Sequence, residues 1–276
     1  MPSFNEITVA QLGRLVGLPD APAVIDVRTD EDAAKDPRLV PGAVRRDWRR
    51  AGEWAGEFAG RRAVVLCQRG LKLSQGACAW ARHEGVEAES LEGGFEAWMA
   101  AGAPLLRTER PPPRDAKGRT AWVARHRPKV DRIACPWLVR RFADPAAAFL
   151  FVAPAEVPAV AERFGATPFD IEGVEWSHRG ELCTFDVVLR EWGLETEALS
   201  RLAAIVRGAD TARMDLAPEA AGLLAVSLGL SRMHRDDLRQ LEAGVAVYDA
   251  LCRWCRDATD ETHNWPVGKG AKGAAA

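Results

Sequence analysis

The chain has 276 residues, which exceeds the usual length of one domain and predicts two. Its 37 basic and 39 acidic side chains leave a formal net charge of -2, so the overall charge supports neither a nucleic acid nor an anionic membrane as a partner. It contains no long apolar run, no secretory signal pattern and only six cysteines, so we expect a cytoplasmic protein with reduced thiols.

Short apolar segments alternate with helical patterns over residues 1–107. Residues 23–27 and 63–67 have the pattern of buried strands, and residues 73–85 have that of a helix ending at Gly85. This alternation predicts an α/β domain with a mostly parallel sheet. Functional loops in such sheets follow the carboxyl ends of strands, which is where Cys67 lies.

The loop that begins at Cys67 combines a thiol with positive charge and a glycine. Arg69 and Lys72 supply the charge, and Gly70 allows a left-handed backbone that brings N–H groups close to an anion. A helix N-terminus and nearby cations favour the thiolate, so Cys67 is a candidate nucleophile. From these residues alone, the alternative is a buried structural cysteine beside a turn.

Four segments in order, VIDVRTDED, VPGAV, VVLCQRGLKLSQG and SLEGGFEAWMAAGAPL, resemble those of rhodaneses of the single-domain sulfurtransferase type. The resemblance implies a rhodanese-like fold and a catalytic Cys67. This cysteine would take sulfane sulfur from a donor such as thiosulfate, hold it as a persulfide, and pass it to a thiol or another thiophilic acceptor. No cofactor is required for such a transfer.

The resemblance also implies roles for the residues around Cys67. Arg69, Gly70 and Lys72 would bind the sulfur donor, and the short loop favours sulfur over phosphate chemistry. Lys72 stands where the family often has arginine, so this position supplies charge without a bidentate guanidinium. Asp26 and Arg28 would form an ion pair that braces the sheet.

Proline and charge mark the end of the first domain. Residues 108–119 contain three prolines among charged residues, which predicts a linker. Residues 120–266 follow as a second, mainly α-helical domain. Residues 267–276 contain only small residues and lysine, and we expect a flexible tail there.

Two histidines of the second domain lie on predicted apolar faces. Residues 174–178 alternate like a strand that turns His178 inward, and residues 231–255 form one helical stripe that includes His234. With Cys183 and Asp237 nearby in the sequence, His178 and His234 are candidate ligands of a transition metal. Satisfied core histidines are the alternative, since the spacing fits no standard zinc finger.

A thiol near arginines is a further candidate site. Cys135 precedes Pro136 at a predicted helix start, and Arg132, Arg140 and Arg141 belong to the same segment. That combination would suit an oxyanion. A solvated arginine face is the alternative.

The segments DRIACPWLVRRF, SHRGELCTF and VYDALCRWC resemble the C-terminal domain of the ChrB family of chromate-resistance proteins. The resemblance covers most of residues 120–265 and implies a role in handling or sensing chromate. The chromate-sensing regulators of that family carry a DNA-binding N-terminal domain, which argues against transcriptional regulation here. Two functions stay open: sulfur transfer linked to chromate resistance, and metal or chromate sensing with a regulatory rhodanese-like domain.

Overall fold

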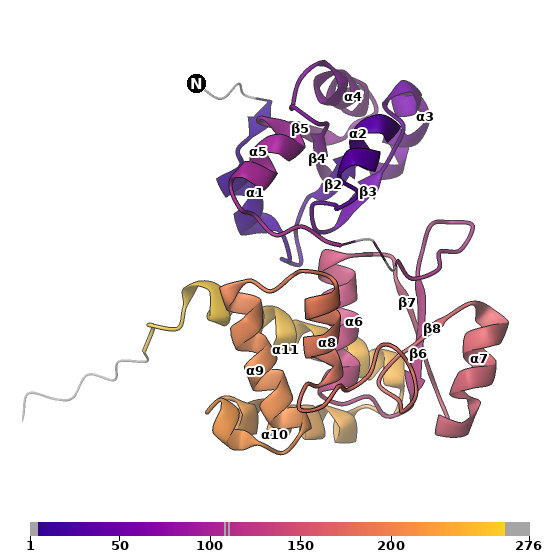
Figure 1. Cartoon of the computed structure of the whole chain (residues 1–276), viewed down its shortest axis with the longest axis vertical. Helices are drawn as coiled ribbons and strands as arrows, with labels where there is room; N and C mark the ends of the chain where they lie inside the picture. The colour runs from indigo at the N-terminus through magenta and orange to yellow at the C-terminus, as the bar shows by residue number, and fades with distance from the viewer. Residues whose placement is uncertain (1–4, 108, 110, 263–276) are drawn as a thin grey trace, which may run out of the picture.

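The computed structural model describes residues 5–107, 109 and 111–262 of the chain. An α/β region comes first and a mainly helical region follows, stacked along the long axis of the molecule (Figure 1). This arrangement confirms the predicted fold class. The predicted tail over residues 267–276 lies outside the described residues.

The N-terminal region is built on a parallel sheet with the strand order β1-β5-β4-β2-β3. The central strand β4 is buried on both faces, because Val64 and Leu66 contact the core under α1 and α5 while Ala63 and Val65 contact the core under α3 and α4. The elements are β1 (Glu6–Ile7), α1 (Val9–Leu15), β2 (Ala23–Asp26), α2 (Asp30–Lys35), β3 (Ala43–Arg45), α3 (Ala51–Trp54), β4 (Arg62–Leu66), α4 (Lys72–His83), β5 (Glu87–Leu91) and α5 (Gly94–Ala100).

Local side chains explain where several of these helices begin. Thr8 caps α1 by accepting the N–H of Gln11, whose side chain accepts the N–H of Thr8 in return. Thr29 is likewise the N-cap residue of α2, and its hydroxyl accepts the N–H of Asp32. The helix predicted to end at Gly85 is α4, and Gly85 has a left-handed φ of 78°.

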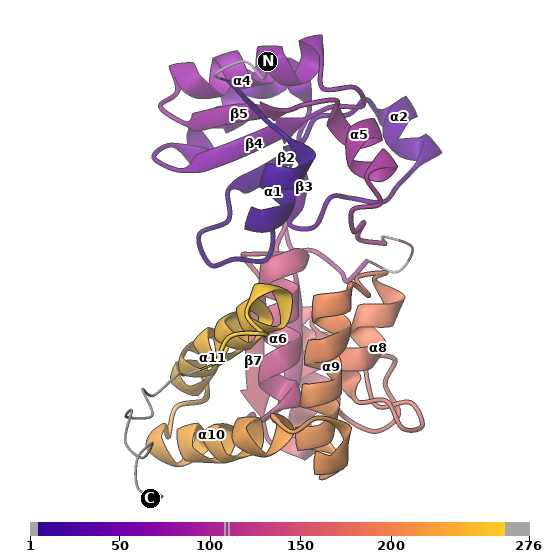
Figure 2. The ribbon, with the colours of Figure 1, turned by 90° about the vertical axis from the view of Figure 1, so that its left-hand side faces the viewer.

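The C-terminal region is mainly helical, but it also contains a parallel sheet with the order β7-β6-β8, which the periodicity does not predict. Helices α6, α9, α10 and α11 gather beside this sheet (Figure 2). The elements are β6 (Ala121–Arg125), α6 (Asp131–Phe142), β7 (Ala148–Val152), α7 (Val157–Phe164), β8 (Thr167–Pro168), α8 (Thr184–Glu191), α9 (Glu197–Asp210), α10 (Ala220–Met233) and α11 (Asp237–Asp257). No helix within the described ranges is long and apolar enough to cross a membrane.

The single helical stripe predicted over residues 231–255 is wrong at its start. Helix α10 ends at Met233, His234 has an extended backbone, and Asp236 caps the new helix α11 by accepting the N–H of Arg239. Leu238 is 50% exposed, so the buried stripe begins only at Leu241. The helical spacing of the residues continues across the turn between α10 and α11. Periodicity alone therefore does not reveal the new helix start that Asp236 caps.

The two regions are in direct contact. The main-chain N–H of Gly42 donates to the carbonyl of Phe142, and that of Arg107 donates to the carbonyl of Trp192. Gly17 lies so close to the Phe142 ring that a Cβ built on it would be 2.5 Å from the ring. Apolar side chains of both regions belong to one continuous core, so the junction is a packed interface.

Candidate functional site

Cys67 lies directly after β4, at the carboxyl end of the strand, and only 4% of it is exposed. Its Sγ is 3.3 Å from the Oγ of Ser74 and 4.0 Å from the carbonyl oxygen of Leu71. The Ser74 hydroxyl donates to that same carbonyl at 3.0 Å, which leaves it free to accept from the thiol. The thiol is therefore held just inside the loop that leads into α4.

Two glycines fix the loop against the start of α5. Gly70 has φ of 68°, and a Cβ built on it would be 2.4 Å from the carbonyl oxygen of Leu91. Gly94 has φ of 61°, and a Cβ there would be 2.3 Å from the carbonyl oxygen of Cys67. The N–H of Phe95 donates to that carbonyl at 3.0 Å. Only glycine allows the two backbones to approach this closely.

The loop provides donors for an anion. In the part of the chain that the structure describes, the N–H groups of residues 69–74 donate to no backbone carbonyl. Successive N–H groups of this kind at a helix N-terminus favour a bound anion. Of the predicted cations, Lys72 is exposed, and Arg69 has a 73% exposed side chain whose Nε lies 3.5 Å from Glu96 Oε1. The hydrogen-bond contacts of the Cys67 thiol within the described structure are with Ser74 Oγ and the Leu71 carbonyl, and the side chains of both cations are largely exposed to solvent.

Substituting Gly94 by alanine is expected to destabilise the chain by about 1–3 kcal/mol and to disturb the Cys67 loop. The new methyl group would have to displace backbone atoms in a conformation that L-residues adopt only at a cost. Gly102→Ala is the matched control, since Gly102 has φ of 64° but nothing within 4 Å of the position that a methyl group would occupy. Urea unfolding should show the larger loss for Gly94→Ala, and equal losses would contradict the close contact.

Asp26 and Arg28 form the ion pair that the resemblance implies. The Arg28 Nη2 lies 2.7 Å from Asp26 Oδ2, and both side chains are fully buried. Arg28 also donates to the carbonyl oxygens of Asp36 and Arg38 and lies 3.7 Å from the centre of the Phe95 ring. The pair thus connects β2 with the end of α2 and with α5.

In the C-terminal region, four polar side chains from separate segments converge. Asp131 begins α6, Asp170 follows β8, His178 lies in the loop before α8, and Asp210 ends α9. The Nε2 of His178 is 3.2 Å from Asp210 Oδ2 and 3.5 Å from both Asp131 Oδ2 and Asp170 Oδ1. We call these four residues the Asp/His cluster.

Asp131 ties the Asp/His cluster to the start of α8. It is fully buried, and its carboxylate accepts the N–H groups of Thr184 at 2.6 Å and Phe185 at 3.0 Å. A carboxylate at this position satisfies two of the free donors of a helix N-terminus. The hydroxyl of Thr184 donates to Asp170 Oδ1 at 3.0 Å.

The closely spaced carboxylates shift the pKa values of residues in the Asp/His cluster. Asp131 and Asp170 together raise the pKa of His178 from 6.5 to about 10. Burial and the charge of Asp131 raise the pKa of Asp210 to about 7, and burial raises that of Asp131 as well. Perturbed pKa values gathered at one place are typical of functional sites.

NMR titration of the metal-free protein should show the imidazole of His178 losing its proton far above its ordinary pKa of 6.5. The carboxylates favour the charged imidazolium, so the midpoint moves upward. The variant Asp210→Asn removes one of them and should lower the midpoint. A midpoint near 6.5 in the unmodified chain would contradict the arrangement.

The structure does not bring together the four metal ligands predicted from the sequence. His234 ends α10, and its carbonyl accepts from Arg127 Nη1 at 2.7 Å, while Asp237 accepts the N–H of Arg127 at 3.1 Å. Among the described residues, the group whose ligand atoms all lie within 4.8 Å is Asp131, Asp170 and His178. The predicted set is therefore wrong for His234 and Asp237, which belong to the turn before α11.

Cys183 is also unsuited to the predicted ligand set. It is fully buried at the N-cap of α8, and its Sγ lies 3.1 Å from Asp186 Oδ2. Burial, and then the charge of Asp131, raise the pKa of Cys183 far above its ordinary value, so the thiol stays protonated. The strand predicted over residues 174–178 is absent from the described structure, in which only Trp176 of this segment forms an isolated bridge, with Phe169.

The carboxylates of the Asp/His cluster are the residues that the sequence analysis missed. Asp170 follows the carboxyl end of β8, the position at which functional residues of parallel sheets are expected. The position of Asp170 could not be recognised from the sequence, because β8 has only two residues and the sheet that contains it was not predicted.

The predicted oxyanion site at Cys135 is wrong. Cys135 and Pro136 lie inside α6 rather than at its start. Arg140 pairs with Glu242 at 2.6 Å, and Arg141 pairs with Asp249 at 2.8 Å, so α11 neutralises both arginines. Burial raises the pKa of the Cys135 thiol well above its ordinary value. The alternative of a solvated arginine face does not hold for Arg140 and Arg141 either, because both side chains are only 20% exposed.

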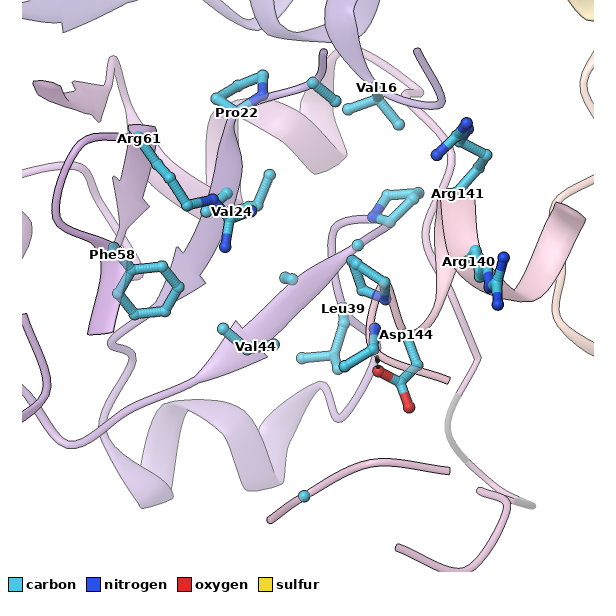
Figure 3. A pocket seen from close by; sticks show the side chains of 18 of the residues that line it. Val16, Pro22, Val24, Leu39, Val44, Phe58, Arg61, Arg140, Arg141 and Asp144 are labelled. Carbon is cyan, nitrogen blue, oxygen red and sulfur yellow. Dashed lines mark hydrogen bonds between the residues drawn. The ribbon is translucent and has the colours of Figure 1, made fainter. Parts of the chain in front are cut away.

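A cavity of about 570 Å³ lies at the junction of the two regions (Figure 3). Val24, Val44 and Phe58 line it from the N-terminal region, and Arg140 and Arg141 line it from the end of α6. Because both arginines are already paired with acidic side chains, they contribute little uncompensated charge to the cavity.

Known structures similar to this chain include several rhodanese-related proteins. A rhodanese-related protein from Thermoplasma volcanium is 21% identical over 37% of this chain and 98% of its own, with a TM-score of 0.33. A rhodanese homolog from Thermus thermophilus is 29% identical over 34% of this chain and 100% of its own, with a TM-score of 0.29. A thiosulfate sulfurtransferase from Pseudomonas aeruginosa is 28% identical over 40% of this chain and 20% of its own, with a TM-score of 0.33.

The C-terminal region matches a described family. Residues 122–255 match the family model described as ChrB, C-terminal domain. A protein named Protein ChrB from Cupriavidus metallidurans is 37% identical over 141 residues, which cover 50% of this chain and 41% of that protein. The chain thus spans less than half the length of this relative. Residues 122–255 therefore match the ChrB C-terminal domain, and they follow an α/β region whose fold resembles that of rhodanese-related structures.

Proposed function

We propose that this chain is a sulfurtransferase in which Cys67 carries sulfane sulfur as a persulfide. The observation that supports this most directly is the position of the Cys67 thiol, at the start of a loop whose N–H groups at residues 69–74 donate to no described backbone carbonyl. Such donors would stabilise the thiolate, the persulfide anion and a leaving oxyanion. The sequence resemblance to rhodaneses supports the same chemistry.

The transfer would take place in two displacements. The Cys67 thiolate attacks the outer sulfur of thiosulfate, the sulfur–sulfur bond of the donor breaks, and sulfite leaves with the electron pair. A thiophilic acceptor such as cyanide then attacks the terminal sulfur of the persulfide. The product is thiocyanate, and the thiolate of Cys67 is released unchanged. Because Cys67 is only 4% exposed, the donor must reach it through the mouth of the loop.

The ChrB C-terminal domain supports a connection to chromate resistance, which we include in the proposal. Its Asp/His cluster favours a second candidate function, a metal or chromate sensor to which the rhodanese-like region is a regulatory unit. The two functions differ in whether chromate tolerance needs the thiol of Cys67.

Intact-protein mass spectrometry after incubation with thiosulfate tests the proposed sulfur transfer. We expect the wild-type chain to gain the mass of one sulfur atom and to lose it again on addition of cyanide, with formation of thiocyanate. A chain that gains no sulfur from thiosulfate, and forms no thiocyanate, would contradict the proposal and favour the sensor.

A further inference from the structure

We propose that Asp131, Asp170 and His178 of the Asp/His cluster bind one divalent transition-metal ion, with Asp210 beside His178. The inference concerns the ChrB C-terminal domain and is independent of sulfur transfer on Cys67. It replaces the ligand set predicted from the sequence, of which only His178 belongs to this cluster.

The ligand atoms of Asp131, Asp170 and His178 all lie within 4.8 Å of one another, close enough for one metal ion to be bound by all three. Metal–ligand bonds of about 2.0–2.2 Å place neighbouring donors of a tetrahedral shell about 3.3–3.6 Å apart. The Nε2 of His178 lies 3.2, 3.5 and 3.5 Å from its three carboxylate oxygens. Hydrogen bonds between charged groups are shorter, about 2.7–2.9 Å, and one Nε2–H can be directed at only one of the three carboxylates.

The place of the cluster in the fold is an independent indication of a ligand site. In the sheet order β7-β6-β8, the chain leaves the central strand β6 toward β7 on one side and returns to β8 on the other. Asp170 follows β8, and Asp131 begins the helix that follows β6. The crevice at the carboxyl ends of two such strands is where open parallel sheets bind their ligands.

The surroundings hold the carboxylates in position. Asp131 is bound by two N–H groups of α8, and Asp170 by the hydroxyl of Thr184. The Nε of Arg132 lies 3.0 Å from Asp170 Oδ2, on the second oxygen of that carboxylate. Metal ligands are commonly oriented by an outer shell of hydrogen bonds, and here an ion pair with Arg132 is added to them.

The donor set indicates the class of metal. Two carboxylates and one imidazole suit Mn²⁺, Fe²⁺ or Zn²⁺, whereas the nearby thiol of Cys183 is engaged with Asp186. The side chain of His178 is 40% exposed, which provides an entry path from solvent to the buried carboxylates of Asp131 and Asp170. The competing arrangement is a protonated His178 that pairs with the carboxylates and needs no metal.

The test uses the full-length chain, without an affinity tag, stripped of metal by a chelator and then dialysed separately against Mn²⁺, Zn²⁺ and Co²⁺. We expect about one equivalent of metal by elemental analysis, and an absorption spectrum of the Co²⁺ form that reports its ligands. The variants His178→Ala and Asp170→Asn should weaken binding by more than about 100-fold, because changes to outer-shell residues alone cost about 10–100-fold. Asp170→Glu should restore binding in part.

Matched controls separate the Asp/His cluster from the remaining metal-binding side chains of the protein. His83→Ala removes a histidine of the N-terminal region, and His234→Ala removes a ligand of the set predicted from the sequence. Both should bind metal like the wild type, as should Cys67→Ser, so a failure of sulfur transfer leaves this test unaffected. Thermal unfolding by circular dichroism verifies that each variant is folded. A wild-type chain that binds no metal, or a folded His178→Ala chain that binds it equally, would overturn the proposal.

Discussion

The variant Cys67→Ser is expected to lose sulfur loading from thiosulfate completely, together with thiocyanate formation. A serine hydroxyl does not form a persulfide, so no other group of the loop can replace the lost sulfur atom. The substitution should leave the fold intact, because the hydroxyl fits where the thiol lies and retains a contact with the Oγ of Ser74. Intact mass after incubation with thiosulfate measures the loss directly.

Cys78→Ala is the matched control for Cys67→Ser. Cys78 is also buried in the N-terminal region, on α4, and burial raises its pKa to about 12. Its thiol is therefore protonated at neutral pH and should contribute nothing to sulfur loading. A sulfur adduct that persists in Cys67→Ser would show that another cysteine carries it. In cells, chromate tolerance that is unchanged by Cys67→Ser would favour the sensor over the sulfurtransferase.

The variant Arg28→Ala is expected to destabilise the N-terminal region by about 3–5 kcal/mol, the usual cost of removing one partner of a buried ion pair. The carboxylate of Asp26 would remain fully buried without its counter-charge. The carbonyl oxygens of Asp36 and Arg38 would each lose a hydrogen bond, and the Phe95 ring would lose the guanidinium beside it. Urea unfolding followed by circular dichroism measures the change.

Two further substitutions separate the loss of the buried ion pair from the general effect of replacing an arginine. Arg28→Lys keeps the charge but cannot reach both carbonyls, so it should recover only part of the stability. Arg49→Ala removes an arginine whose side chain is 68% exposed, and it should change the free energy of unfolding by less than about 0.5 kcal/mol. A loss below about 1 kcal/mol for Arg28→Ala would mean that the pair does not brace the sheet.

The amino-acid sequence by itself determined the organisation around Cys67. The buried strand, the loop and the helix after it are adjacent in the chain, so local periodicity and turn residues were enough to order them. The ion pair of Asp26 and Arg28 is likewise local, since the two residues are neighbours at one strand end. The resemblance of residues 120–265 to ChrB proteins was also readable from short segments.

Only the tertiary structure decided how exposed the key groups are and which of them meet. Cys67 is buried because its side chain packs into the core under α3 and α4, among segments that periodicity treats separately. The stripe through His234 is interrupted because Asp236 caps a new helix. The Asp/His cluster depends on the order of β7, β6 and β8, which brings carboxylates together from distant parts of the chain. Side-chain periodicity describes one element at a time and carries no record of which elements become neighbours.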